Sequence, residues 1–557
     1  MRNLLKLLPL LFTVLLTAQQ DQKVYKVSYD SYANGEKNDR QVSFYFHKGI
    51  VYNSKDTDKI KQYTDVINQQ NISTITFKKE LYKSVVDFKD LPKPTFTDKT
   101  ATILDYECKY ASFFYFSNTI EVWYTEEARV KGSPYSSYLP TADALVLRVL
   151  INGNRELKVS AIQEVTPVKA LEFLVDDAIA VDKPAFEALK IESRYHKIVI
   201  FDDEQINYDP SIPVAKDAVL SLNKTYRFAN GTVLLKKVSL TPDLKDSKVF
   251  VKLYSRSNGD AYDRTGSVFI IPGSQMASIL NGFQYGLDQL PVYTDSKDNT
   301  YQGVLNDGNY APAIELMRFF TAFGTHHFND KRAIKNYDWA ENVMYNQEVT
   351  PLIPSDEDEI WVGVFIGNYD KGGHKVSLEL DFYPSMASVK KPVNKYINSL
   401  FSTVNRMEAN GQNYGRLFKN DTLKVTFEIT ENIKDLQLIY TTTGHGGWVD
   451  GDEYMPRMNR VLVDGEQVFA VVPWRSDCAT YRLSNPASGN FGNGLSSSDY
   501  SRSNWCPGTL TTPYYVPLHS LKKGKHSMEI IIEQGNDGGT SFSHWGVTGV
   551  LTGSIVK

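Results

Sequence analysis

The sequence predicts an all-β protein built from sheet-on-sheet sandwiches. Apolar residues alternate with polar ones in several segments, which is typical of strands with one face in a core. The clearest of these segments are Leu423 to Ile429, Val376 to Phe382, Met528 to Ile532 and Tyr25 to Tyr29. Turns rich in Gly, Asn, Asp and Pro separate the short strands, as in β-sandwiches. Aromatic residues reach 12% of the chain, and strands favour such side chains.

The length of 557 residues predicts about two to four domains, because one domain usually has ~100–200 residues. Helical patterns are scarce, and the two best candidates, Lys169 to Lys190 and Tyr396 to Arg406, lie where domains could join. Pro184 can occupy a first helical turn. We therefore expect a signal peptide at 1–19, a β-rich accessory domain at 20–165, a linker with helical content at 166–194, and two further domains at 195–387 and 388–557.

The N-terminus has the features of a secretory signal. Arg2 and Lys6 precede an apolar run from Leu7 to Leu16, and Thr17-Ala18 lead into a polar stretch. The run is much shorter than the ~20 apolar residues that a membrane-spanning helix needs. We therefore expect an exported protein, secreted or periplasmic, with no membrane span.

Charge and cysteine content narrow the class of protein further. The formal net charge is −4, from 61 basic and 65 acidic residues, so the chain lacks the basic footprint of a nucleic-acid-binding protein. Of its three cysteines, Cys478 and Cys506 flank a stretch rich in Ser, Asn and Gly that buries little apolar surface. A disulfide between them would stabilise that stretch by roughly 3–4 kcal/mol. Cys108 lies among apolar residues and is expected to be buried and free.

Three polar clusters interrupt the pattern of strands and turns. Each cluster alone is compatible with an ordinary turn, core or solvated loop. They are Ser257 to Arg264, which includes Asp260 and Asp263; the glycine-rich Gly444 to Tyr454, which includes His445, Trp448, Asp450, Asp452 and Glu453; and Ser501 to Gly508, which includes Arg502 and Trp505.

Together these clusters make residues 195–557 resemble the peptide-N-glycosidase F family of secreted bacterial amidases, which remove N-linked glycans from glycoproteins. The resemblance rests on Tyr262-Asp-Arg264 before a strand, on Gly444-His445 followed by Glu453-Tyr454, and on Arg502 with Trp505-Cys-Pro-Gly508. It implies two adjacent jelly-roll β-sandwiches with the substrate in a groove between them. An N-terminal antiparallel β-rich accessory domain would precede these two sandwiches.

The resemblance also implies roles for individual residues. Asp263 matches the essential catalytic aspartate, and Glu453 matches the glutamate that the second sandwich contributes. Seven further residues are expected to bind substrate. Arg264 would orient the site, His445 would lie in the groove, and Arg502 and Trp505 would line the sugar side. Tyr454 and Tyr369 stand where the family has Trp, and Trp448 is an additional aromatic. Cys506 matches one half of a family disulfide, and Cys478 is placed to be its partner.

These residue types suit the expected reaction, hydrolysis of the amide between Asn and the first GlcNAc. The reaction needs a base that activates water, stabilisation of the oxyanion and a proton for the departing glycosylamine. Two carboxylates in different environments can divide these tasks, and an arginine can keep a carboxylate ionised. Aromatic rings provide apolar faces for sugars. We expect no metal and no cofactor, a monomeric protein, and N-glycoproteins and glycopeptides as partners.

The chain departs from the family pattern at the groove. Gly367 stands where the family has a second glutamate that holds the first sugars, and Thr443 stands where it has Trp. Loss of large side chains suggests a roomier site at the innermost sugar. We hypothesise that the site tolerates core fucose.

The N-terminal region has a weaker resemblance, to the GLPGLI family of secreted β-rich proteins. It is based on Ile103 to Lys109, Ile120 to Thr125, Gly132 to Tyr135 and Tyr138 to Pro140. This family implies no known chemistry, and the region is expected to form an antiparallel, partly curled sheet.

Three other functions stay open at this point. A secreted, non-catalytic glycan-binding protein would use the same aromatics without needing Asp263 and Glu453 to meet. A copper enzyme could use paired jelly rolls, but His326 and His327 are adjacent, and adjacent strand residues point to opposite faces. An endoglycosidase also uses two carboxylates, and only the family resemblance favours amide cleavage over it.

Overall fold

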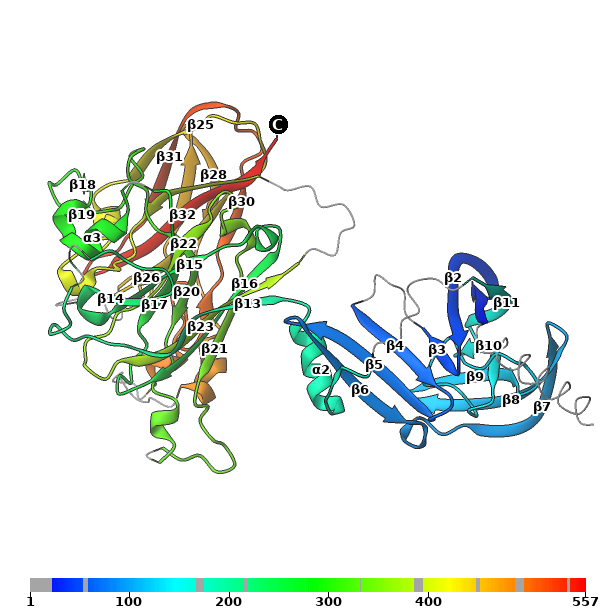
Figure 1. Ribbon diagram of the computed structural model, residues 1–557. Helices are drawn as coiled ribbons and strands as arrows, with labels where there is room; N and C mark the ends of the chain where they lie inside the picture. The colour runs from blue at the N-terminus through cyan, green and yellow to red at the C-terminus, as the bar shows by residue number, and fades with distance from the viewer. Residues whose placement is uncertain are drawn as a thin grey trace, which may run out of the picture. The chain divides into compact units, whose positions relative to one another are not determined.

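The computed structural model describes residues 23–556 except 54–58, 167–174, 215, 217, 276, 331, 385–393, 447–450, 486–494 and 538–540. The chain divides into two compact units, Met1–Arg194 and Tyr195–Lys557 (Figure 1). Strands dominate both units, so the predicted all-β class is confirmed. The expected signal peptide at 1–19 and the expected boundary at 387/388 lie outside the described residues.

The first unit contains one large sheet in which most strands pair antiparallel with a neighbour along the chain, and β1 pairs antiparallel with β11. The sheet order is β12-β6-β5-β4-β3-β2-β1-β11-β10-β9-β8-β7, and only the short pairing of β12 with β6 is parallel among the described strands. The strands are β1 (Val24–Ala33), β2 (Glu36–His47), β3 (Ile50–Tyr52), β4 (Ile60–Asp65), β5 (Gln70–Phe77), β6 (Glu80–Asp87), β7 (Thr95–Ile103), β8 (Tyr106–Tyr115), β9 (Asn118–Thr125), β10 (Leu145–Ile151), β11 (Arg155–Val165) and β12 (Ile179–Ala180).

This sheet curls, as an open sheet of more than ~10 strands usually does. One hydrophobic cluster joins Phe44 of β2 and Val51 of β3 to Ile103 of β7 and Phe113 of β8, although these strands are far apart in the sheet order. Cys108 is buried in the same cluster and is free, as predicted.

The predicted helix from Lys169 to Lys190 is only partly correct. Residues 167–174 lie outside the described part of the chain, and the observed helix α2 is Lys183–Glu192. Asp182 caps it by accepting a hydrogen bond from the backbone of Ala185 at 2.8 Å, and Pro184 lies in the first turn as expected. Of the helices that the structure describes, none has the length and apolar character needed to span a membrane.

The second unit begins with a sandwich of two sheets. One has the order β13-β23-β16-β21, and the other has the order β14-β15-β22-β17-β20-β29. The strands are β13 (His196–Ile206), β14 (Thr225–Phe228), β15 (Val233–Ser239), β16 (Lys248–Ser257), β17 (Thr265–Pro272), β20 (Ile314–Phe320), β21 (Val343–Glu348), β22 (Glu359–Ile366), β23 (His374–Tyr383) and β29 (Leu510–Thr511). The short helix α3 (Ile279–Tyr285) and the hairpin of β18 (Val292–Thr294) and β19 (Thr300–Gln302) lie between β17 and β20 in the chain.

A second sandwich follows in the same unit, so the predicted pair of jelly-roll sandwiches is confirmed. Its sheets have the orders β24-β32-β26-β30 and β25-β31-β27-β28. The strands are β24 (Lys395–Ser402), β25 (Leu423–Ile429), β26 (Ile433–His445), β27 (Asn459–Val463), β28 (Glu466–Val471), β30 (Tyr514–Pro517), β31 (Gly524–Ile532) and β32 (His544–Ile555).

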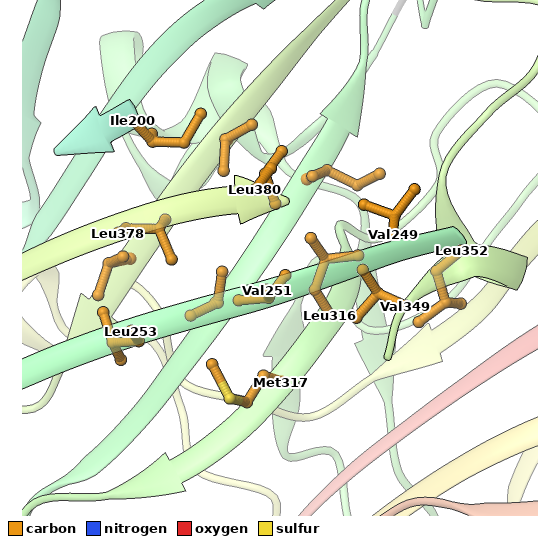
Figure 2. Packing of buried hydrophobic residues seen from close by; sticks show 14 of the residues in the cluster. Ile200, Val249, Val251, Leu253, Leu316, Met317, Val349, Leu352, Leu378 and Leu380 are labelled. Carbon is orange, nitrogen blue, oxygen red and sulfur yellow. The ribbon is translucent and has the colours of Figure 1, made fainter. Parts of the chain in front are cut away.

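Each sandwich encloses a hydrophobic core between its two sheets. In the first, Val251 and Leu378 from one sheet pack near Leu316 from the other (Figure 2). In the second, alternate residues of β25 are buried from Leu423 to Ile429, as the alternation in the sequence predicted. The first core also includes Ile439 of β26 and Val550 of β32, so the two sandwiches pack directly against each other.

The prediction of a helix from Tyr396 to Arg406 is wrong. Residues Lys395–Ser402 form β24, which pairs antiparallel with β32 and has an irregular register between Ser399 and Phe401. Consecutive residues from Ser399 to Met407 are buried because this part of the chain is covered on both sides. Burial of both faces and the register shift hide the two-residue period that would have indicated a strand.

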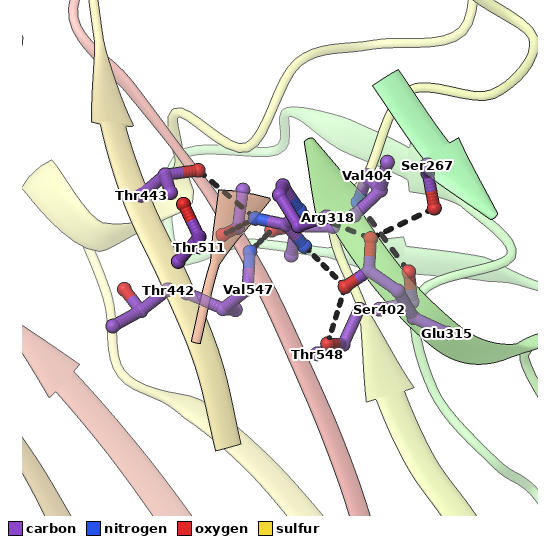
Figure 3. Close-up of polar contacts among 12 residues, drawn as sticks. Ser267, Glu315, Arg318, Ser402, Val404, Thr442, Thr443, Thr511, Val547 and Thr548 are labelled. Atoms are coloured by element: carbon purple, nitrogen blue, oxygen red, sulfur yellow. Dashed lines mark hydrogen bonds and ion pairs between the residues drawn. The ribbon is translucent and has the colours of Figure 1, made fainter. Parts of the chain in front are cut away.

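A buried ion network joins the two sandwiches (Figure 3). Glu315 of β20 accepts hydrogen bonds from Arg318 at 2.7 and 3.0 Å and from Thr548 of β32 at 2.8 Å. Arg318 donates onward to Thr443 at 2.9 Å and to the carbonyl of Gly546 at 2.6 Å. Burial alone would raise the pKa of Glu315, but the Arg318 guanidinium holds that pKa below its usual value. The network is therefore charged as well as buried.

Replacing Glu315 with Gln should destabilise the protein strongly. The substitution leaves the Arg318 guanidinium, which is 1% exposed, without its countercharge, and breaking a buried ion pair costs about 3–5 kcal/mol. Urea denaturation should show this loss in the free energy of unfolding. Lys424→Met removes an exposed pair with Glu529 at 3.2 Å and should cost less than about 1 kcal/mol. A similarly small loss for E315Q would contradict the importance of the network.

Candidate active site

Asp263 lies in the turn between β16 and β17, and neighbouring polar groups fix this turn. The Asp260 carboxylate accepts hydrogen bonds from the backbone of Tyr262 at 3.0 Å and from the Arg264 side chain at 2.7 Å. The Thr321 hydroxyl accepts from the backbone of Arg264 and donates to the carbonyl of Tyr262, both at 2.8 Å. These contacts hold the turn, and the Asp263 carboxylate is left to contact Arg502 of the second sandwich.

Glu453 lies in the second sandwich, directly after the buried residue Asp452. The Asp452 carboxylate accepts hydrogen bonds from the Trp545 indole at 2.7 Å and from Arg457 at 2.8 Å. The backbone N–H of Glu453 donates to the carbonyl of Gly446 at 3.3 Å, so Glu453 is adjacent to the end of β26, where His445 lies.

Arg502 brings the two predicted catalytic carboxylates together. Its Nη1 atom lies 3.0 Å from Oδ2 of Asp263 and 2.6 Å from Oε1 of Glu453. Its Nη2 atom donates to the carbonyl of Ser497 at 2.7 Å, and its side chain is only 1% exposed. A fixed cation thus holds one acid from each sandwich.

The environment of Asp263 raises its pKa to about 6. Burial is the main cause, the negative charge of Glu453 adds to it, and the positive charge of Arg502 opposes it. The Asp263 carboxyl therefore changes protonation close to neutral pH, as a group that accepts and returns a proton should.

Arg264 has a different position from the one expected of an arginine beside Asp263. It pairs with Asp260, and the arginine that bonds Asp263 is Arg502. The Arg264 guanidinium lies over the rings of Tyr262 and Tyr369, at 5.0 and 4.8 Å from their centres. These two rings are 59% and 60% exposed, so they form an accessible aromatic surface next to Asp263.

His445 is held as a neutral ring by the interface network. Thr443 accepts a hydrogen bond from Arg318, so its single hydroxyl proton is available for Nε2 of His445, which lies 2.8 Å away. Burial lowers the pKa of His445 well below 6.5, and His544, Arg318 and Arg502 lower it further. We infer that Nε2 accepts and Nδ1 carries the proton.

Trp505 packs against the Arg502 guanidinium. It is 3% exposed, stacks on Phe320 at 4.2 Å and lies 4.1 Å from the Arg502 guanidinium. Its ring faces are therefore covered by Phe320 and Arg502, and its expected place on the sugar side stays a prediction. The predicted disulfide between Cys478 and Cys506 is present next to it. Tyr454 also packs by Arg502, at 5.3 Å, whereas Trp448 lies outside the described residues.

Sequence reasoning missed Glu408, a carboxylate from the loop after β24. The hydroxyls of Tyr369 and Tyr414 both donate to its Oε1 atom. A Cβ atom added at Gly367 would lie 3.2 Å from its Oε2 atom. Burial raises the pKa of Glu408, and Tyr414 and Arg264 oppose this. Glu408 thus places a carboxylate next to the position where the family glutamate is missing.

Metal-ligating side chains are not gathered around these carboxylates in the part of the chain that the structure describes. The grouping found there is Asp477 with Cys478 and Cys506. Because the two cysteines form the disulfide, they offer no thiolate to a metal.

Comparison with known proteins identifies the family. A solved structure of PNGF-II is 39% identical over 96% of this chain and 99% of its own, with a TM-score of 0.82. The chain belongs to the peptide-N-glycosidase F family. Family models described as the N-terminal and C-terminal parts of peptide-N-glycosidase F match residues 197–382 and 413–552. A model described as an N-glycanase N-terminal domain matches 19–186, and the resemblance to the GLPGLI family stays a prediction.

Two further solved structures resemble this chain to different degrees. The structure of PNGase F, a glycosylasparaginase from Flavobacterium meningosepticum, is 13% identical over 65% of this chain and 96% of its own, with a TM-score of 0.42. A second structure of PNGF-II is 38% identical over 96% of this chain, with a TM-score of 0.82. A search of curated proteins found no match.

Proposed function

We propose that this chain is a peptide-N-glycosidase that hydrolyses the amide between Asn and the first GlcNAc of N-glycoproteins and glycopeptides. The product is a free glycan and a peptide in which Asn has become Asp. The observation that supports this most directly is the contact of a single Arg502 nitrogen with both Asp263 and Glu453. A protein that only binds glycans has no need for two acids from separate sandwiches on one buried guanidinium.

Asp263 serves as the base in this proposal. Its ionised carboxylate takes a proton from a water molecule, whose oxygen forms a bond to the Asn side-chain carbonyl carbon. The C–N bond then breaks, and the proton passes from Asp263 to the departing glycosylamine nitrogen. Arg502 and Glu453 keep Asp263 oriented, and the pKa of about 6 suits both directions of proton transfer.

The aromatic surface of Tyr262 and Tyr369 supplies the substrate contact next to Asp263. Exposed rings offer apolar faces for sugar or peptide, and Glu408 offers a hydrogen-bond acceptor for a hydroxyl or an N–H group. The basic and apolar N-terminal sequence supports export to the periplasm or the medium. We propose that the protein acts there as a monomer.

Asp263→Asn should lower glycan release from a short glycopeptide by at least ~10²-fold, because it removes the catalytic base. Mass spectrometry of the peptide can follow conversion of Asn to Asp. Asp298→Asn is the matched control, since Asp298 lies in the exposed turn between β18 and β19 and should leave release unchanged. Near-normal release by D263N with an intact fold would rule out this role.

The pH profile should report the charges around Asp263. Release requires the ionised carboxylate, so kcat/KM should rise with pH through about 6 and level off above it. Arg502→Met removes the cation that lowers this pKa, so the midpoint should move up by about one unit or more. Glu453→Gln removes the anion that raises it, so the midpoint should move down.

Single-turnover assays can measure the residual activity of both variants. Midpoints that move in the same direction, or that do not move, would contradict the assignment of this ionisation to Asp263.

Core fucose should be tolerated because Gly367 has no side chain and the acid beside it comes from another loop. We expect release from a core α1,3-fucosylated glycopeptide as well as from its unfucosylated form. Gly367→Gln should place a side chain against Glu408 and fill the space beside the innermost sugar. It should reduce release from the fucosylated glycopeptide at least about tenfold more than release from the unfucosylated glycopeptide. Gly367→Ala, with its single methyl, should have a much smaller effect. Failure of the unchanged protein on the fucosylated glycopeptide alone would contradict the hypothesis.

A further inference from the structure

A cavity lies between the two sandwiches, away from Asp263 and Glu453. It has a volume of about 380 Å³ and is lined at the ends of strands β17 and β32, by Pro272 and Ile555. The opposite ends of these strands, Thr265 and His544, lie near Asp263 and His445. With a rise of ~3.3 Å per residue, β17 alone separates the cavity from Asp263 by roughly 25 Å.

The lining of this cavity is rich in neutral hydrogen-bonding groups. Asn306, Asn309 and Asn398 contribute carboxamides, and Tyr396 contributes a half-buried ring with a hydroxyl. The Asn306 amide is fixed by hydrogen bonds to Asn398 at 3.0 Å and to the carbonyl of Ser399 at 2.9 Å. The groups are therefore preorganised.

The charges in the lining indicate which polar molecule fits. Asp356 and Glu357 contribute carboxylates, which disfavour an anion. The Lys395 ammonium is already engaged, because it donates to the carbonyls of Thr350 and Ile353 at 2.8 and 3.0 Å. A volume of 380 Å³ is at the small end of the ~300–1,000 Å³ range of small-molecule sites.

We propose that this cavity is a second sugar-binding site that takes one or two residues of a neutral oligosaccharide. Sugar hydroxyls match the carboxamides and the carboxylates, and the Tyr396 ring offers an apolar face. The role of the site rests on the proposed function. A substrate with several glycans binds it with one glycan while another lies at the catalytic acids, which raises the effective concentration of substrate there.

Methyl NMR of the full-length protein can test binding at this cavity directly. Ile314, Ile397 and Ile555 line it, so their ¹³C-labelled methyl groups report occupancy there. Titration with N,N′-diacetylchitobiose, and separately with a mannose disaccharide, should shift these signals for at least one of the two sugars. No shift at about 10 mM of either sugar, a concentration that detects millimolar dissociation constants, would overturn the proposal.

One variant locates the binding more closely. Asp356→Ala removes an exposed carboxylate from the lining and should weaken sugar binding about threefold or more. Asp358→Ala is the control, because Asp358 is exposed on the same loop, pairs with Lys245 and does not line the cavity. Equal weakening by both variants would contradict the site.

Kinetics separate this proposal from the proposed catalytic function. Asp356→Ala should raise KM for a denatured protein that carries several glycans, and leave kcat/KM for a short glycopeptide with one glycan unchanged. Methyl shifts without any glycan release by the unaltered protein would refute the catalytic proposal and support the cavity. Normal release with silent methyl groups would refute the cavity alone.

Discussion

The ion pair between Glu315 and Arg318 determines how the two sandwiches meet. Both residues are on β20 of the first sandwich. Glu315 also accepts a hydrogen bond from Ser267 of β17, and the other side-chain hydrogen bonds of the pair go to Thr443, Gly546 and Thr548 of the second sandwich. Removing two charges from water is costly unless good geometry satisfies them, so alternative packings that break these contacts are strongly disfavoured. The apolar contacts of Ile439 and Val550 provide attraction, and the ion pair selects one register of the interface.

The geometry of the candidate active site depends on this register because the site is divided between the sandwiches. Asp263 comes from a turn of the first and Glu453 from a loop of the second, and Arg502 contacts both acids. The ion network also reaches the site through Thr443, which fixes His445. A small displacement of one sandwich would change the distance from Arg502 to Asp263, and with it the balance of charges that raises the pKa of Asp263 to about 6.

The sequence predicts those parts of the fold and the site that local patterns determine. Strands with one buried face, such as β25, show a regular alternation of apolar and polar residues. The end of β24 is buried on both faces and lacks this alternation, so its sequence predicts a helix instead. Asp263 and Glu453 could be named because each lies in a recognisable local motif. The pairing of Arg502 with both acids, and the position of Glu408, could not be foreseen, because they depend on loops far apart in the chain meeting across the interface.

Glu408 places a carboxylate beside Gly367 that the sequence around β22 does not supply. At position 367 a carboxylate would come from the end of β22 in the first sandwich, but Gly367 supplies none. Glu408 comes instead from the loop after β24 and is fixed by Tyr369 and Tyr414. Glu408 belongs to the second sandwich, so the carboxylate beside Gly367 is not attached to the strand that carries Gly367. A Cβ atom at position 367 would lie 3.2 Å from Oε2 of this fixed acid, so a residue with a side chain there would have to displace Glu408 or the tyrosines that hold it.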